Sequence, residues 1–181
     1  MSVFIEKEIE LVETILGPYR GAMGENYMGY RNHVYRMLHF CFALHSVTEE
    51  EKKKLMIAAC FHDLGLFTHN TVDYLPPSVE LAKQYLQTNK LDAWAEEISL
   101  MIDMHHKITA YENPKYPLVE VFRVADLADF SLGLLKGELS GEFVNEVKEN
   151  FSNAGFHMNL LKVGTRWVLA HPFNPAPIIK W

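Results

Sequence analysis

The amino-acid sequence predicts an all-α protein with one domain. Apolar residues recur at three- and four-residue intervals along nearly the whole chain, and no convincing alternation of apolar and polar residues indicates a β-strand. The 181 residues are enough for one hydrophobic core and few for two domains. No repeat or linker divides them. We therefore expect a single helical domain over residues 1–181.

Local signals place the helices in chain order. The Gly-Pro pair at 17–18 ends the first one, and the three glycines of residues 20–29 indicate a loop. Thr48 and Glu51 form a capping-box pattern, and the prolines at 76–77 open a later helix. The expected helices cover about residues 3–16, 30–45, 48–61, 76 onward, 92–106 (capped by Asp92), 118–132, 141–151 and 155–170, followed by an extended tail with three prolines.

Composition and charge exclude several classes of partner. The net charge of −6 argues against a surface for a nucleic-acid polymer or an anionic membrane. No apolar run approaches the roughly 18 residues of a membrane-spanning helix, and the acidic, amphipathic N-terminus does not resemble a signal peptide. Cys41 and Cys60 lie in apolar helical runs, which indicates reduced, buried thiols. We expect a cytoplasmic protein.

Several expected helices carry a His or Asp residue on an apolar face. His33 begins the buried stripe of its helix, and His62 lies on the apolar face at the C-terminal end of another. Asp63 follows at that end, where the helix dipole repels a carboxylate. Asp126 lies on an apolar face in mid-helix, where an unpaired carboxylate is costly to bury. These four residues need partners in the interior.

The helix expected at 92–106 adds His105 and His106, at least one of which points inward. Each of these polar residues has a structural explanation of its own: a hydrogen-bonded core histidine, a helix C-cap, or an ion pair of Asp126 with Arg36 or Arg123. Together they favour one divalent cation held by two imidazoles and two carboxylates. This mixed N and O donor set suits Mn²⁺, Fe²⁺, Co²⁺, Ni²⁺ or Zn²⁺ better than Ca²⁺ or Mg²⁺. Asp129, one turn beyond Asp126, is expected in solvent.

Four segments in order, "YRNHVYRM", "AACFHDLGLF", "MIDMHHKI" and "RVADLADFS", resemble the HD-domain superfamily of metal-dependent phosphohydrolases. Its H…HD…D motif lies on an all-α bundle. The resemblance covers about residues 27–136 and leaves the C-terminal helices and tail, 141–181, outside the motif core. It implies that the metal ligands are His33, His62, Asp63 and Asp126.

The resemblance also implies further roles. Asp63 would orient the attacking water, and His105 or His106 would line the site and hold substrate or a second metal ion. Dinuclear members of the superfamily have another histidine on the helix after the HD doublet, but none occurs here between His69 and His105. His69 falls in an expected loop and is a weaker ligand candidate. One metal ion is therefore expected, which also weakens a di-iron oxygenase interpretation.

The predicted function is hydrolysis of a small phosphate ester, with a nucleotide as the first choice, by a metal-activated water. Lys107 and Arg36 are candidates for neutralising phosphate oxygens; a solvated helix end and an ion pair are their alternative explanations. The alternatives for the protein are another metalloenzyme on this scaffold, either a cyanamide-hydratase-like lyase or an iron oxygenase, and a non-catalytic metal-binding regulatory protein.

The expected partner is a small phosphorylated substrate, with no nucleic-acid polymer and no membrane. The oligomeric state stays open at this point. Trp167, Phe173 and Trp181 near the end of the chain either cover the core or form an interface between copies in a homo-oligomer.

Overall fold

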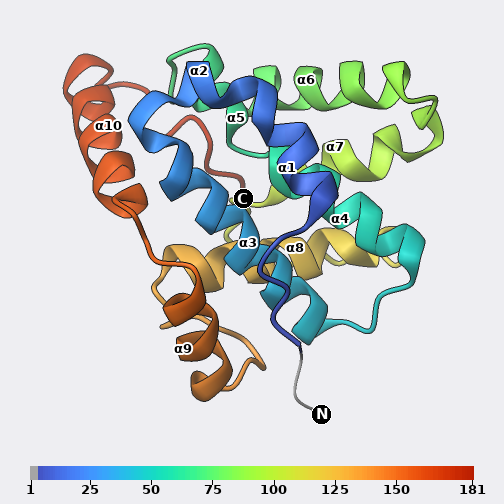
Figure 1. Ribbon diagram of the computed structural model, residues 1–181. Helices are drawn as coiled ribbons and strands as arrows, with labels where there is room; N and C mark the ends of the chain where they lie inside the picture. The colour runs from blue at the N-terminus through green and yellow to red at the C-terminus, as the bar shows by residue number, and fades with distance from the viewer. Residues whose placement is uncertain (1–3) are drawn as a thin grey trace.

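The computed structural model describes residues 4–181, and its regular structure consists of helices joined by short turns (Figure 1). The α-helices are α1 (Glu10–Leu16), α2 (Arg20–Met23), α3 (Tyr27–Leu44), α4 (Glu49–Phe61), α5 (Leu64–Thr68), α6 (Leu75–Thr88), α7 (Ala95–Met104), α8 (Pro117–Phe130), α9 (Gly141–Asn150) and α10 (Phe156–Ala170); the 3₁₀ helices are η1 (Gly17–Tyr19), η2 (Gly24–Asn26) and η3 (Asp92–Trp94). No β-strand occurs among the described residues. The predicted all-α class is confirmed.

The long helix α3 runs through the middle of the molecule (Figure 1). It packs against α8 and α4 on its inner sides and against α9 near its C-terminal half. Nearly all of its residues from Tyr27 to Cys41 are buried, so polar side chains on this helix, including His33, must find partners inside the protein.

The α4–α5 junction gives the HD doublet its position. Thr48 and Glu51 form the predicted capping box at the start of α4. The helix ends at Phe61, and the chain turns at His62 and Asp63 before α5 begins. Gly65 lies inside α5. A Cβ atom there would be 2.5 Å from the carbonyl oxygen of Tyr74, so glycine permits the close approach of α5 to the start of α6.

The N-terminal region differs from its prediction. The helix expected at 3–16 begins only at Glu10, and residue 3 lies outside the described residues. The loop expected at 20–29 is helical, since it contains α2, η2 and the first turn of α3. Pro18 ends neither the helical backbone nor its hydrogen bonding at this point. It occupies the first turn of η1, where no helical hydrogen bond needs its missing N–H group.

The C-terminal region forms an outer layer. Helix α10 lies at the left edge of Figure 1, and the chain then returns so that the C-terminus lies near the middle of the view. The tail is held against the segment after α7: Ile108 N donates to Lys180 O (2.9 Å), and Lys180 Nζ pairs with Asp103 (3.0 Å). Phe173 and Trp181 are exposed and do not cover the core, contrary to one of the two expectations for them.

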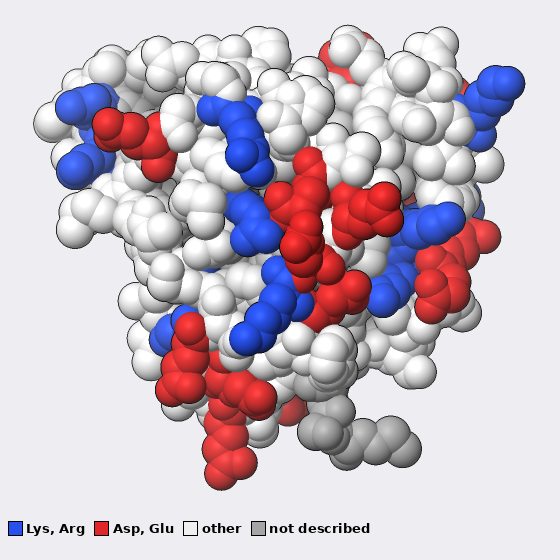
Figure 2. Space-filling model, in the orientation of Figure 1, with Lys and Arg blue, Asp and Glu red and all other residues white. Residues whose placement is uncertain are grey.

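Charged side chains of both signs share the visible surface. On the face shown in Figure 2, Lys and Arg are interspersed with Asp and Glu, and no extended basic area appears there. None of the helices within residues 4–181 has the length and apolar character that crossing a membrane would need.

Candidate metal centre

Three parts of the fold bring His33, His62, Asp63 and Asp126 together. His33 comes from α3, the HD doublet from the α4–α5 turn, and Asp126 from α8, and all four side chains are buried. The Nε2 atoms of His33 and His62 are 3.0 Å apart. Asp126 Oδ1 is 3.5 Å from His33 Nε2, and Asp63 Oδ2 is 3.3 Å from His62 Nε2. The four predicted ligands therefore form one cluster.

The hydrogen bonds of the imidazoles leave their Nε2 lone pairs facing one another. His62 Nδ1 donates to the carbonyl oxygen of Ala59 (2.8 Å), and His33 Nδ1 donates to the Asp129 carboxylate (2.7 Å). In the neutral form, each ring therefore carries its proton on Nδ1 and presents a bare Nε2. Two bare nitrogens 3.0 Å apart repel each other unless a cation or a proton lies at the site.

Asp129 is a part of the site that sequence reasoning missed. It was expected in solvent, but it is buried, accepts the Nδ1–H of His33 and pairs with Arg36 through both carboxylate oxygens (2.5 and 2.8 Å). Burial opposes its ionisation, but His33 and Arg36 outweigh it and hold the pKa of Asp129 well below its usual value. The signal was available, because Asp126 and Asp129 are three residues apart on one helix.

The Arg36 side chain makes its contacts inside the protein. Its guanidinium pairs with Asp129 and donates to the carbonyl oxygens of Phe151 and Ser152 (3.0 and 3.1 Å). This contradicts the expectation that Arg36 neutralises phosphate, because its donors are engaged and its side chain is buried. The ion-pair alternative holds instead, with Asp129 as the partner.

Both histidines at the end of α7 reach the cluster. His105 Nδ1 donates to Ile102 O (2.7 Å), and its Nε2 lies 3.4 Å from Asp63 Oδ1. Neither of these two facing atoms has a hydrogen-bond partner among residues 4–181. His106 Nδ1 is 3.9 Å from Asp126 Oδ2, and its Nε2 is hydrogen-bonded to the hydroxyl of Tyr74 (2.8 Å). His105 and His106 thus extend the cluster.

Two tyrosines complete the surroundings, and sequence reasoning missed both. The Tyr30 hydroxyl donates to Cys60 O (3.0 Å) and accepts the backbone N–H of Asp63 (3.3 Å), which fixes the turn that carries the doublet. Tyr74 arrives from the loop before α6, so no periodic pattern connects it with the motif. Tyr30 is three residues before His33 on α3, so the two side chains lie on the same helix face. The sequence spacing alone could have shown this.

The two clustered carboxyl groups have opposite pKa shifts. Burial opposes ionisation of Asp63, but the His62 and His105 imidazoles outweigh it and hold the pKa of Asp63 well below its usual value. Burial raises the pKa of Asp126, and the nearby histidines offset this only in part. Asp63 is therefore the more readily ionised member of the pair.

A cavity of about 200 Å³ opens onto the cluster. His33, Asp63, His106 and Asp126 form its polar end, together with Tyr74. The remaining walls are apolar and come from α5, the end of α8, α10 and the C-terminal tail. Lys107 does not line this cavity, and its Nζ donates to the hydroxyl of Thr109. The exposed His69 pairs with Thr68 and lies outside the cluster.

A family model for the HD domain matches residues 30–130, which is more than half of the chain. The chain belongs to the HD-domain family. The matched range agrees with the predicted motif core at 27–136 and confirms the resemblance. Comparison with curated proteins and with solved structures gives no match.

The residues of this HD domain suit a divalent metal ion, which its family is known for binding. One nitrogen or oxygen from each of His33, His62 and Asp126 lies within 4.8 Å of the others, and the same holds for His62, Asp63 and His105 and for His105, His106 and Asp126. The bare imidazole nitrogens and the unpartnered oxygen of Asp63 are the observations that carry this fit. Asp129 orients His33 as an outer carboxylate commonly does for a metal-binding imidazole.

Proposed function

We propose that this HD domain is a metal-dependent phosphohydrolase that acts on a small phosphate ester. The observation that carries the proposal is the set of bare imidazole nitrogens and carboxylate oxygens that meet at the end of an open cavity. A buried cluster of this kind without an external face would be structural, whereas a cluster at a cavity leaves room for water and substrate.

His33, His62, Asp63 and Asp126 would hold the ion, for which Mn²⁺, Fe²⁺, Co²⁺, Ni²⁺ and Zn²⁺ are the candidates. When bound, such an ion makes a water molecule acidic near neutral pH and polarises a phosphoryl oxygen. Asp63 has one oxygen toward His62 and a second, unpartnered one toward His105. This second oxygen is available to accept a hydrogen bond from the attacking water and to orient it.

His105 approaches Asp63 and His106 approaches Asp126 from the end of α7. A neutral imidazole hydrogen-bonded to Tyr74 keeps a fixed ring orientation, so His106 presents Nδ1 toward the cavity at a defined place. Burial lowers the pKa of His106, and the neighbouring His105 ring lowers it further. His106 therefore serves as a neutral hydrogen-bonding group for substrate or leaving group.

A second candidate reaction is addition of water to an uncharged substrate, as in a hydratase. It is favoured by one observation: no Lys or Arg is among the described residues that line the cavity. A phosphate group bound there must rely on the ion for charge neutralisation, since Arg36 and Lys107 are engaged elsewhere.

The experiment begins with elemental analysis of protein purified without chelator. The same sample is then tested for phosphate release from a panel of phosphate esters and for oxygen consumption. Bound transition metal with phosphate release supports the proposal. Metal without phosphate release but with water added to neutral substrates supports the hydratase, and oxygen consumption would identify an oxygenase. Protein that binds no added divalent ion contradicts all three reactions.

A further inference from the structure

The wall of the cavity opposite the cluster is built almost entirely from apolar side chains. Phe130 at the end of α8, Phe156, Leu160 and Val163 on α10, and Ile178 in the tail form most of it. Phe156 also stacks on the His33 ring, with the ring centroids 4.3 Å apart, so the apolar wall reaches the metal-binding residues themselves. A substrate whose phosphate group (its head) lies at the cluster must place its remaining atoms against this wall.

Three basic side chains close to the cluster or to the tail are engaged by other groups. Lys180 follows Ile179 of the cavity lining, but its Nζ pairs with Asp103 at 3.0 Å. Arg36 pairs with Asp129, and Lys107 bonds to Thr109. Among the described lining residues, Asp63 and Asp126 are the only formally charged groups, and both belong to the cluster. A charged group on the substrate away from its head would therefore lose water without gaining a partner.

The size of the cavity limits the organic group further. Its volume is about 200 Å³. An apolar cavity of about 150 Å³ is enough to bind benzene. The phosphate group would take part of this volume, so the enclosed space that remains suits a phenyl ring or a short branched alkyl chain. A ribose with a base attached would extend out of the open cavity.

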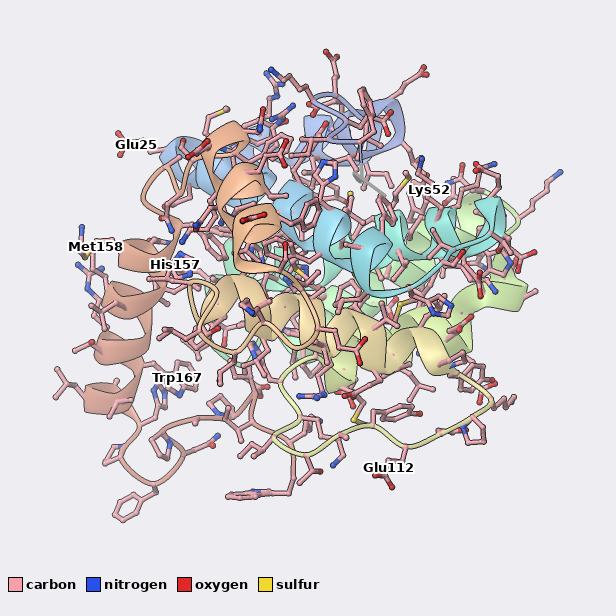
Figure 3. All side chains as sticks on the ribbon, turned by 90° about the horizontal axis from the view of Figure 1, so that it is seen from below. Glu25, Lys52, Glu112, His157, Met158 and Trp167 are labelled. Carbon is pink, nitrogen blue, oxygen red and sulfur yellow. The ribbon has the colours of Figure 1, made fainter. Side chains whose placement is uncertain are left out.

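The two sides of α10 differ in what they face. Leu160 and Val163 line the cavity, whereas Val168 and Leu169 do not and instead line a neighbouring groove. This groove shares Phe130, Leu160 and Gly164 with the cavity. Figure 3 shows Met158 at the outer edge of α10, while His157 lies on the side toward α8, where its Nε2 bonds to Asp129 O (3.1 Å). The inner face of α10 is thus placed to select substrates.

We propose that the substrate is a phosphate monoester of a small, uncharged, apolar alcohol or phenol, and that Leu160 and Val163 of α10 select this group. The inference rests on the proposed phosphohydrolase function and narrows it, because it replaces the nucleotide first expected by an aryl or branched alkyl ester.

The first test compares matched substrates on the metal-loaded protein. 4-Methylphenyl phosphate and 4-carboxyphenyl phosphate have nearly the same shape, but the second carries an extra charge in the apolar part of the cavity. We expect kcat/KM to be at least about tenfold higher for the methyl compound, and higher for it than for a nucleoside monophosphate. Equal values, or a preference for the nucleotide, would overturn the inference and leave phosphate hydrolysis itself intact.

A pair of variants on one helix tests the wall directly. Val163→Lys places an ammonium group at the cavity, and Val168→Lys places the same group one groove away, at a residue that does not line the cavity, as the control. Val163→Lys should lower kcat/KM for the methyl compound about tenfold and reduce or reverse the preference against the carboxylate. Val168→Lys should leave both values near those of wild type. Unfolding midpoints of both variants show whether each one is folded.

Binding without turnover separates this inference from the function on which it rests. Calorimetry measures the affinity of the cavity for 4-methylphenol and for 4-hydroxybenzoate, even if the protein hydrolyses no ester. We expect the neutral phenol to bind more tightly to wild type and to lose affinity in Val163→Lys but not in Val168→Lys. If this pattern appears but no ester releases phosphate, the proposed hydrolysis is wrong, whereas the proposed preference of the cavity for an apolar group is supported. If neither phenol binds, or both variants behave alike, the specificity is wrong.

Discussion

At the scale of single residues, the HD doublet meets other side chains through imidazole nitrogens that face each other and through a carboxylate oxygen without a partner among the described residues. The bare Nε2 atoms of His33 and His62 face each other at 3.0 Å, and Asp63 Oδ1 faces His105 Nε2 at 3.4 Å. Unpaired buried polar atoms destabilise a fold by about 1–3 kcal/mol each, so their concentration at one place indicates a bound group. In the metal-free protein, a proton bound to one of the imidazoles would also reduce this cost.

The first prediction concerns competition between that proton and the metal ion. Burial disfavours a charged His62, but Asp63 and Asp126 outweigh it and raise the pKa of His62 to about 8. Below this pH the metal-free ring is protonated and has no lone pair for an ion, so metal binding must release a proton. We expect the apparent metal affinity to fall up to about tenfold per pH unit below pH 8 and to level off above it.

Calorimetric titrations of the metal in buffers of different ionisation enthalpy measure this proton directly. About one proton per ion is expected near pH 7 if His62 alone titrates, and almost none above pH 9. The His33 pKa is lowered by burial, so this ring contributes little in that range. An affinity that stays constant from pH 6.5 to 8 would show that His62 is not the protonated group.

The second prediction concerns Asp129, which acts through its neighbours. Asp129→Asn should lower metal affinity by about 10- to 100-fold, because His33 loses the carboxylate that fixes its ring. It should also destabilise the fold by about 3–5 kcal/mol, since Arg36 stays buried without its charged partner. Metal titration and urea unfolding of the metal-free protein measure the two effects separately. Unchanged affinity with reduced stability would limit Asp129 to a structural role.

At the scale of the helices, sequence periodicity predicted long elements well and short ones poorly. Helices α3, α4 and α8 form within a few residues of their expected ranges because each has a long apolar stripe to bury. Helices α2 and α5 were missed, because short helices are held by tertiary contacts more than by their own sequence. Asp63 was placed beside the cluster from its sequence position, but the α5 turn that follows it was not foreseen.

The third prediction tests the packing that holds this turn. Gly65→Ala puts a Cβ atom 2.5 Å from Tyr74 O and 2.9 Å from Ser78 Oγ. Backbone cannot move aside as a flexible side chain does, so overpacking should destabilise the fold by about 1–3 kcal/mol. The matched control is Gly21→Ala in α2, where no atom lies within 4 Å and Ala should be neutral or stabilising by up to about 1 kcal/mol.

Chemical denaturation of both glycine variants gives the comparison. Because Gly65 contacts the residue whose hydroxyl bonds to His106, its replacement should also raise KM by moving Tyr74 at the cavity. Equal stability of the two variants would mean that α5 and α6 can separate at little cost, and that Tyr74 is not fixed by this contact.

At the scale of the whole molecule, the candidate centre joins parts of the chain that are far apart in sequence. It draws on α3, the α4–α5 turn, the end of α7 and α8, which span residues 27–130. The order of the motif could be deduced from sequence, because His33, His62 and Asp126 each lie on an apolar helix face and Asp63 directly follows His62. The ion pair of Arg36, the position of Tyr74 beside His106 and the apolar cavity wall formed by α10 could not be deduced from the sequence. They depend on how the helices pack against one another. Metal binding should therefore stabilise the entire fold rather than one helix.

The last prediction measures this coupling between metal and fold. An ion that binds only the native state stabilises it by about 2.7 kcal/mol when its free concentration is 100 times Kd. For a protein of this size, 1 kcal/mol corresponds to roughly 2–4 °C in Tm, so saturating Mn²⁺ or Zn²⁺ should raise the wild-type Tm by roughly 5–10 °C, and chelator should reverse the rise. Asp63→Ala should show a much smaller rise and no turnover, because a charged ligand and the water-orienting oxygen are both lost. Asp92→Ala, which removes an exposed carboxylate outside the cluster, should keep the full metal-dependent rise. If Asp63→Ala gains as much stability from metal as Asp92→Ala does, the ion is held elsewhere and the doublet is structural.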